Sequence, residues 1–207
     1  ISADVFLNSP AIRADRRLSQ YAAIIREQNE RLDQQVEKVL QLAKVERSNF
    51  ELHPEPVRLA ALLETVLEGA RLQLDQRHGS LQTELSATEA QVLADPLHLK
   101  NILYNLLDNA VKYCRQQPRV YVRTGQEGDA LLVQVEDNGI GIAREFQNRV
   151  FDKFYRIPTG NVHDVKGFGL GLYYVKKICD AHGWQIRLES EEEKGTRVTI
   201  RMPIYRI

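Results

Sequence analysis

Three polar residues, Asn105, Asn109 and Lys112, are spaced so that they could together hold an anionic ligand. On a helix of 3.6 residues per turn they fall on one stripe. A broad apolar stripe lies opposite and can pack on a sheet; it comprises Leu99, Ile102, Leu103, Leu106 and Ala110. Two amide groups and an ammonium group would then point away from the core. An ordinary solvated face has the same pattern, so this helix does not by itself establish a binding site.

Three glycine-bearing segments further along the chain could complete such a site. Residues 137–142 read Asp-Asn-Gly-Ile-Gly-Ile after a predicted strand, and glycines there permit close approach to a ligand or a positive φ. Residues 166–172 open a predicted helix, where backbone N–H groups commonly receive phosphate. Residues 194–196, Lys-Gly-Thr, form a turn before a strand. Each segment alone is weak evidence, because Asp and Gly are also common turn residues.

The surrounding pattern predicts the elements that would position these segments. Asp95 suits an N-cap and Pro96 the first turn of the polar-striped helix, and a second helix is predicted over 59–77. Period-two alternation predicts strands over 81–85, 91–94, 119–124 and 131–136, with a loop at 125–129, and two more strands around 184–188 and 198–202. Since helices and hairpins interleave, we expect an α/β sandwich with a mixed sheet and helices on one face.

The first fifty residues have a different, helical pattern. Residues 3–7 are typical of a helix end and residues 8–10, Asn-Ser-Pro, of a turn. A heptad seam then follows, made of Leu18, Tyr21, Ile25, Gln28, Leu32, Gln35, Val39 and Leu42. Such a helix must pair, either within the chain or with the same hairpin of a second chain. Two prolines break the pattern, so we expect a helical hairpin over 1–50, a linker over 51–58 and a domain over 59–207.

Composition excludes several classes of function. The 207 residues contain 28 Lys plus Arg and 28 Asp plus Glu, which gives no net charge to favour nucleic acid or an anionic membrane. Cys114 and Cys179 lie in apolar patterns without CxxC spacing, which favours buried thiols in a reducing compartment. No apolar run approaches membrane-spanning length and no signal peptide opens the chain. We therefore expect a cytoplasmic segment without membrane contact, and a membrane anchor upstream stays open.

The order of the polar segments resembles the catalytic domain of sensor histidine kinases. The Asn-x-x-x-Asn-x-x-Lys-Tyr helix matches the N box, 137–141 the G1 box, 151–156 the F box, 167–172 the G2 box, and 195–196 the final Gly-Thr. The match covers 57–203, and 1–50 is similar to the truncated end of the family's dimerisation and phosphoacceptor hairpin. The resemblance implies an α+β chain with the Bergerat-type sandwich of gyrases and histidine kinases. It also implies ATP or ADP, Mg²⁺, a homodimer and a response regulator receiver domain as partners.

The resemblance also implies roles for particular residues. Asp137 would accept a hydrogen bond from the adenine amino group, assisted by Thr196, while Gly139 and Gly141 let the backbone pass close to the base. Asn109 would bind Mg²⁺. The residues expected at the phosphates or against the nucleotide are Asn105, Lys112, Tyr113, Gly167, Gly169, Leu170 and Gly171. Arg156 and Lys166 belong to the family's lid, about 155–166, where they either reach the phosphates or are solvated. Phe151 and Phe154 would anchor that lid by packing.

The five histidines depart from the family pattern. None of them has the acidic neighbour and downstream threonine and proline of the family's acceptor histidine; they are His53, His78, His98, His163 and His182. We therefore expect that the chain does not phosphorylate itself and that the acceptor belongs to a preceding segment. A smaller departure is Trp184, at a position where the family usually has glycine, which we interpret as strand packing.

Position 105 distinguishes classes of enzyme within the fold. Hydrolytic relatives have a carboxylate there as general base, and the amide of Asn105 cannot accept that proton. We expect a histidine kinase that transfers the γ-phosphoryl group of Mg-ATP to a histidine and so signals to a response regulator. The alternatives are a non-catalytic scaffold or pseudokinase, and a serine-directed protein kinase of the same fold. Complete nucleotide boxes weigh against the first, and the long heptad helix weighs against the second.

Overall fold

The computed structural model describes residues 15–45, 51–87, 89–157 and 168–206. The chain separates into two compact units, Ile1–Phe50 and Glu51–Ile207, and each is described by itself. The helix end and turn predicted over 3–10 lie outside the described residues, as do Lys166, Gly167 and most of the predicted lid. His163 lies outside them as well.

The first unit contains one long helix, α3, over Arg16–Val45. The Asp15 carboxylate caps its start and accepts hydrogen bonds from the backbone N–H groups of Arg17 at 2.8 Å and Leu18 at 3.1 Å. Many of its apolar side chains are exposed, among them Leu18, Tyr21, Ile25, Leu32, Val36 and Val39. These include members of the heptad seam, so α3 carries an uncovered apolar stripe. No helix in the described parts of the chain is long and apolar enough to cross a membrane.

The second unit is built on one seven-stranded sheet in the order β1-β3-β7-β5-β4-β2, with β6 also paired to β7. Its strands are β1 Glu55–Arg58, β2 Ser80–Leu85, β3 Gln91–Ala94, β4 Arg119–Glu127, β5 Ala130–Asp137, β6 Gln185–Glu191 and β7 Gly195–Tyr205. Only β2 and β4 pair in parallel, and every other pair is antiparallel. The predicted mixed sheet is confirmed.

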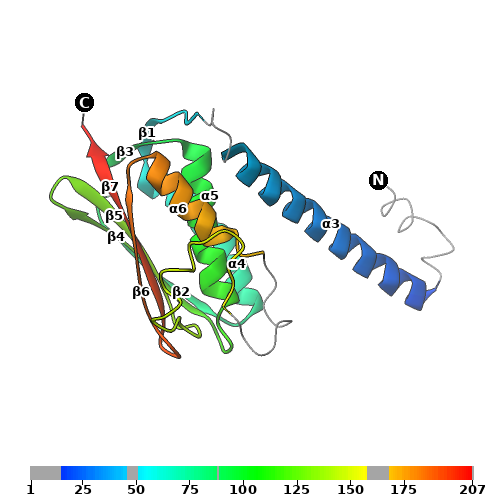
Figure 1. Cartoon of the computed structure of the whole chain (residues 1–207). Coiled ribbons are helices and arrows are strands. Elements are labelled where there is room, and N and C mark those ends of the chain that lie inside the picture. Colours follow the sequence, from blue (N-terminus) through cyan, green and yellow to red (C-terminus); the bar gives the residue numbers. More distant parts are fainter. Residues whose placement is uncertain (1–14, 46–50, 88, 158–167, 207) are drawn as a thin grey trace. The chain divides into compact units, whose positions relative to one another are not determined.

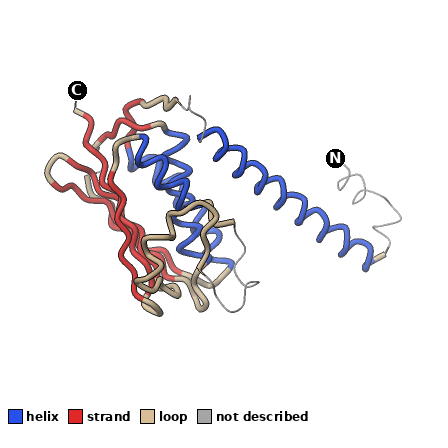
Figure 2. Tube along the Cα trace, viewed as in Figure 1, coloured by secondary structure: helices blue, strands red, loops and turns tan. Residues whose placement is uncertain are grey.

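Three helices, α4 over Leu59–Gln76, α5 over Pro96–Lys112 and α6 over Gly171–Ala181, cover one face of this sheet (Figures 1 and 2). The predicted apolar stripe of α5 is fully buried, with Leu99, Ile102, Leu103, Leu106 and Ala110 all at most 3% exposed. The core forms between these helices and the inward side chains of the strands, such as Val122, Val133 and Ile200. The predicted sandwich with helices on one face is therefore confirmed.

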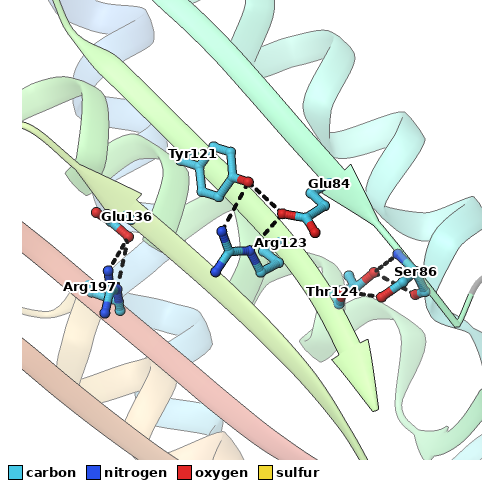
Figure 3. A network of polar contacts seen from close by, with 7 residues as sticks. All are labelled: Glu84, Ser86, Tyr121, Arg123, Thr124, Glu136 and Arg197. Atoms are coloured by element: carbon cyan, nitrogen blue, oxygen red, sulfur yellow. Dashed lines mark hydrogen bonds and ion pairs between the residues drawn. The ribbon is translucent and has the colours of Figure 1, made fainter.

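The other face of the sheet is polar, as period-two alternation requires. Tyr121 donates a hydrogen bond to Glu84 at 2.6 Å, and the Arg123 guanidinium donates to the same carboxylate oxygen at 2.9 Å (Figure 3). Glu136 on β5 pairs with Arg197 on β7 at 2.8 Å (Figure 3). Each of these contacts to Glu84 and Glu136 joins side chains of neighbouring strands, so these polar groups of the uncovered face have hydrogen-bond partners within the sheet itself.

The β4–β5 hairpin is tighter than its sequence predicts. The β4–β5 ladder continues through Gly125, Gln126 and Glu127, which pair with Leu132, Leu131 and Ala130. Only Gly128 and Asp129 remain to form the turn. Gly128 takes φ of 61° in this turn, a conformation that glycine adopts at low cost. The predicted loop at 125–129 was too long, because glycine within a strand gives the same local signal as glycine in a turn.

Candidate functional site

The polar stripe of α5 lies against the start of α6. A side chain at Gly171 would place its Cβ 3.0 Å from Asn105 Oδ1 and 3.7 Å from Asn109 Nδ2. The Asn105 amide is oriented by the bond that its Nδ2 donates to the Asn101 carbonyl at 2.8 Å. A Cβ at 171 would press on the Asn105 amide, so glycine lets the start of α6 lie close to the stripe.

The start of α5 is fixed by its predicted cap. Asp95 is buried, and its Oδ1 accepts hydrogen bonds from the N–H groups of Leu97 at 3.1 Å and His98 at 3.2 Å. Its Oδ2 accepts a third from His53 N–H at 3.1 Å. The predicted N-cap and the proline in the first turn are both confirmed.

The end of α5 is held by a residue that the sequence did not single out. The Arg77 guanidinium donates hydrogen bonds to the carbonyl of Val111 and, at 2.6 Å, to that of Cys114. A cation there complements the negative end of the helix. Lys112 lies with its Nζ 5.5 Å from the centre of the Tyr113 ring, and burial raises the pKa of Tyr113. Arg77 thus fixes the backbone that carries these two predicted site residues.

Asp137 is the last residue of β5, and within the described residues only one of its two carboxylate oxygens accepts hydrogen bonds. Its Oδ1 accepts hydrogen bonds from the N–H groups of Gly139 at 2.7 Å and Thr196 at 3.3 Å. Among the described residues, nothing donates to the second oxygen, Oδ2. Burial raises the pKa of Asp137 to about 6, against the opposing effect of the two backbone donors. The carboxylate therefore offers one acceptor oxygen to a ligand at neutral pH.

Two glycines near Asp137 are required by the protein's own backbone. Gly141 has φ of 65°, and a Cβ there would lie 1.9 Å from the Glu191 carbonyl oxygen. Gly195 has φ of 111°, and its Cβ would lie 1.9 Å from the Asp137 carbonyl oxygen. A side chain at Gly139 would meet Asp137 Oδ1 at 2.7 Å. These contacts bring the β6–β7 turn against the segment after β5, and so place Thr196 beside Asp137.

Three further residues hold this segment and were missed by sequence reasoning. Asn138 Oδ1 accepts from Arg119 N–H at 2.7 Å, and its Nδ2 donates to the Gln117 carbonyl at 3.3 Å. Ser190 and Gln147 join the segment to β6. The only sequence signal for Ser190 was that it lies six residues before Thr196. In the β6–β7 hairpin this spacing makes the two residues direct cross-strand partners.

The segments on either side of the predicted lid meet at Gly169. Gly169 has φ of 69°, and a Cβ there would lie 2.4 Å from the Tyr155 carbonyl oxygen. Phe154 N–H donates to the Gly169 carbonyl at 3.1 Å, and Leu170 is buried. Phe154 is 59% exposed and has φ of 63°. Its expected role as an anchor of the lid stays a prediction, because most of the lid lies outside the described residues. Phe151 is partly buried.

Two partly buried histidines and both buried cysteines have structural surroundings. His98 Nδ1 lies 2.6 Å from the Tyr174 hydroxyl, and His182 Nε2 accepts from Asp95 N–H at 3.0 Å. Burial lowers the pKa of both imidazoles. Trp184 is buried and stacks on His182 with ring centres 4.1 Å apart, in line with the expected packing role. Cys114 and Cys179 are buried, unpaired thiols, as predicted.

Comparison with known proteins places this architecture among ATPase domains. Residues 94–206 match the family of histidine kinase-, DNA gyrase B- and HSP90-like ATPases. The sensor protein RprX of Bacteroides fragilis is 40% identical over 203 residues, which are 97% of this chain and 39% of RprX. The sensor histidine kinase WalK of Bacillus subtilis is 28% identical over 88% of this chain and 30% of WalK. The chain thus spans less than half the length of these relatives.

Solved structures agree with this placement. The histidine kinase AdeS of Acinetobacter baumannii is 25% identical with a TM-score of 0.71, over 93% of this chain and 86% of that chain. Full-length ShkA, crystallised in complex with AMPPNP, has a TM-score of 0.83 at 24% identity, over 100% of this chain and 42% of that one. At that identity the second likeness concerns the fold alone.

The mixed sheet and the helices that cover one of its faces define an α/β sandwich of the histidine kinase and ATPase type. The chain belongs to the histidine kinase-, DNA gyrase B- and HSP90-like ATPase family, and it carries the ATP-binding catalytic domain of sensor histidine kinases.

Proposed function

We propose that this chain binds Mg-ATP between α5, α6 and the end of β5, and that it transfers the γ-phosphoryl group to a histidine. One observation carries the proposal. A half-buried carboxylate with one acceptor oxygen available lies in the same domain as two amides that border the start of a helix. The carboxylate suits an exocyclic amine, and the helix start suits phosphate. These are the two ends of an adenine nucleotide.

Each predicted residue has a role in this proposal. Asp137 accepts from the adenine amino group beside Thr196, Gly139 and Gly141, while Tyr113 lies against the nucleotide. Asn105, acting with Lys112 as the catalytic pair, orients the phosphates. The backbone N–H groups at the start of α6 receive them, through the segment that contains Lys166, Gly167, Gly169, Leu170 and Gly171.

Asn109 is the proposed ligand of Mg²⁺. The described residues contain no group of three or more His, Cys, Asp or Glu side chains able to hold a metal ion. A single amide oxygen still fits Mg²⁺, which commonly keeps several waters and is otherwise bound by substrate phosphates. The ion would neutralise charge that develops on the transferred group.

The residues also support transfer in preference to hydrolysis. The amide of Asn105 cannot take a proton from water, so ATP would persist until a nucleophilic imidazole arrives in line. We propose that this imidazole belongs to a helical hairpin of which residues 1–50 are a part. The linker to the catalytic domain is shorter than the predicted 51–58, because Glu55–Arg58 already form β1 of the sheet. The exposed apolar stripe of α3 supports a homodimer through that hairpin. A response regulator receiver domain would then take the phosphoryl group.

The test is the affinity for ATP of the Asp137→Asn variant, measured by calorimetry. The amide can present a donor to the adenine amino group, and the loss of a hydrogen bond to a charged group costs about 1.5–3 kcal/mol, or roughly tenfold to a hundredfold in affinity. Asp129→Asn is the matched control, because Asp129 lies in the exposed β4–β5 turn and pairs with Arg201. Equal affinity in the wild type and the Asp137→Asn variant would remove base recognition from this carboxylate.

A further inference from the structure

Ser190 lies beside the two residues that face the base in the proposed site. Alternation along β5 and β7 puts Asp137 and Thr196 on the helix-covered face, in line with the buried Val135 and Val198. Ser190 is directly opposite Thr196 in the β6–β7 ladder, so it shares that face. Three polar side chains from three strands therefore gather at one end of the sheet.

The Ser190 hydroxyl makes three contacts, each at 2.8 Å. Ile142 N–H donates to Ser190 Oγ, Ser190 Oγ donates to the Gly195 carbonyl, and Ser190 Oγ meets Thr196 Oγ1. The arrangement is held by Gln147, whose side-chain amide donates to the carbonyls of Ile142 at 2.9 Å and Ser190 at 2.7 Å. Ser190 thus has little freedom to rotate or shift.

Counting protons fixes the direction of the third contact. A serine hydroxyl has one proton and two lone pairs. The Gly195 carbonyl has no proton, so that contact uses the Ser190 proton, and the N–H of Ile142 uses one lone pair. Ser190 can then only accept from Thr196. The reverse direction would leave the Gly195 carbonyl without this bond, so the arrangement with Thr196 as donor satisfies one more polar group.

We propose that Ser190 is a specificity-determining residue. Its hydroxyl accepts the hydrogen bond that the Thr196 hydroxyl donates, so that only hydrogen-bond acceptors face the base. This inference rests on the proposed nucleotide site. Asp137 Oδ2 and the Thr196 lone pairs then meet the ligand together. An exocyclic amine satisfies such an edge, whereas the carbonyl of a 6-oxo purine faces acceptors and is repelled. Ser190 therefore favours adenine over hypoxanthine without touching either base.

The variant that tests this is Ser190→Ala, with ATP and inosine triphosphate as the two ligands. The Thr196 hydroxyl is then able to rotate and donate to a 6-oxo group. The ratio of ATP affinity to inosine triphosphate affinity should fall about three- to tenfold, which is the effect of one neutral hydrogen bond. A role in folding alone would weaken both nucleotides equally and leave this ratio unchanged.

Two further variants make the result specific. The double variant Ser190→Ala/Thr196→Val should have the same affinity ratio as Thr196→Val alone. Without the Thr196 hydroxyl, removal of Ser190 Oγ has no donor to redirect towards the ligand. Ser86→Ala is the control for the loss of a serine hydroxyl that bonds a threonine elsewhere in the sheet, since Ser86 Oγ donates to the Thr124 carbonyl on β4 (Figure 3). It should leave the ratio at the wild-type value.

The outcomes separate the inference from the proposed function. Equal changes for both nucleotides in Ser190→Ala, or no change for either, overturn the role of Ser190. If Ser190→Ala does not fold, the Thr196→Val variant decides. Loss of the lone pairs of Thr196 Oγ1 should then lower the ratio of ATP affinity to inosine triphosphate affinity, and an unchanged ratio contradicts the inference. Failure of the wild-type chain to bind ATP would instead overturn the proposed function.

Discussion

Among single residues, Asp137 would couple the proposed base recognition to pH. Burial raises its pKa to about 6, while the N–H groups of Gly139 and Thr196 act in the opposite direction. The folded-state pKa lies above the ordinary aspartate value of 3.8, so the folded chain binds this proton more tightly than the unfolded chain. The contribution of Asp137 to stability therefore grows as the pH falls from about 6 towards 4. Its ability to accept a hydrogen bond declines over the same range.

We expect affinity for adenosine to fall roughly tenfold per pH unit below about 6, because only the carboxylate form accepts from the amine. Adenosine is the suitable ligand since it carries no titrating phosphate. Calorimetry between pH 5 and about 8 measures the effect. The Asp137→Asn variant should bind weakly with a flat profile over this range. A wild-type profile that is equally flat would show that the carboxylate stays charged or does not contact the base.

At the scale of elements, the sequence predicts best what is decided locally. The start of α5 followed from Asp95 and Pro96, and its buried stripe from helical periodicity, because both signals are local in the sequence. The three covering helices and the mixed sheet followed from the same kind of pattern. The tight β4–β5 turn did not, since Gly125 has the same local signature in a strand as in a turn.

The support of the candidate site was the part that local patterns could not predict. Ser190, Gln147 and Asn138 reach the segment after β5 from distant parts of the chain, and their contacts depend on strand register and loop closure. Arg77 acts on the end of α5 from the end of another helix. Phe154 is exposed and has a positive φ, neither of which its place in the F box predicts.

The close contact of the β6–β7 turn with the segment after β5 is tested by Gly141→Ala. The change combines a left-handed φ with a Cβ 1.9 Å from the Glu191 carbonyl oxygen. We expect it to lower the free energy of unfolding by about 3 kcal/mol, from backbone strain and overpacking together. Urea denaturation measures the loss.

Gly128→Ala provides the matched control, because Gly128 has a similar φ of 61° and open space around it. It should cost only about 1 kcal/mol, the strain of the left-handed conformation alone. Equal losses in the two variants would mean that the turn and the segment can separate without consequence.

For the whole molecule, the family and the proposed site give ATP two possible fates, transfer or hydrolysis. Asn105 lacks a proton-accepting group, and the described histidines include two that are engaged in the interior, His98 and His182. The catalytic domain is therefore expected to hold ATP intact until an acceptor histidine is presented to it.

Incubation of the chain with γ-labelled ATP should give little inorganic phosphate and no acid-labile label on the chain itself. Transfer should appear when a longer relative is added that carries the hairpin histidine but is disabled by Asn109→Ala at the matching position. Phosphate release and acid-labile label are measured separately. Rapid release of phosphate, at many turnovers per minute, would contradict the assignment to a kinase and favour a hydrolytic relative.

The position of β7 has a consequence for how the protein is made. This strand comes last in the domain but lies in the middle of the sheet, with β5 on one side and β3 and β6 on the other. During synthesis β1 and β3 cannot join β2, β4 and β5 in one sheet until residues 195–205 have left the ribosome. Thr196 arrives with that strand, so the proposed base-binding edge is among the last parts of this domain to form. The proposed nucleotide site is then complete only after β7 has joined the sheet.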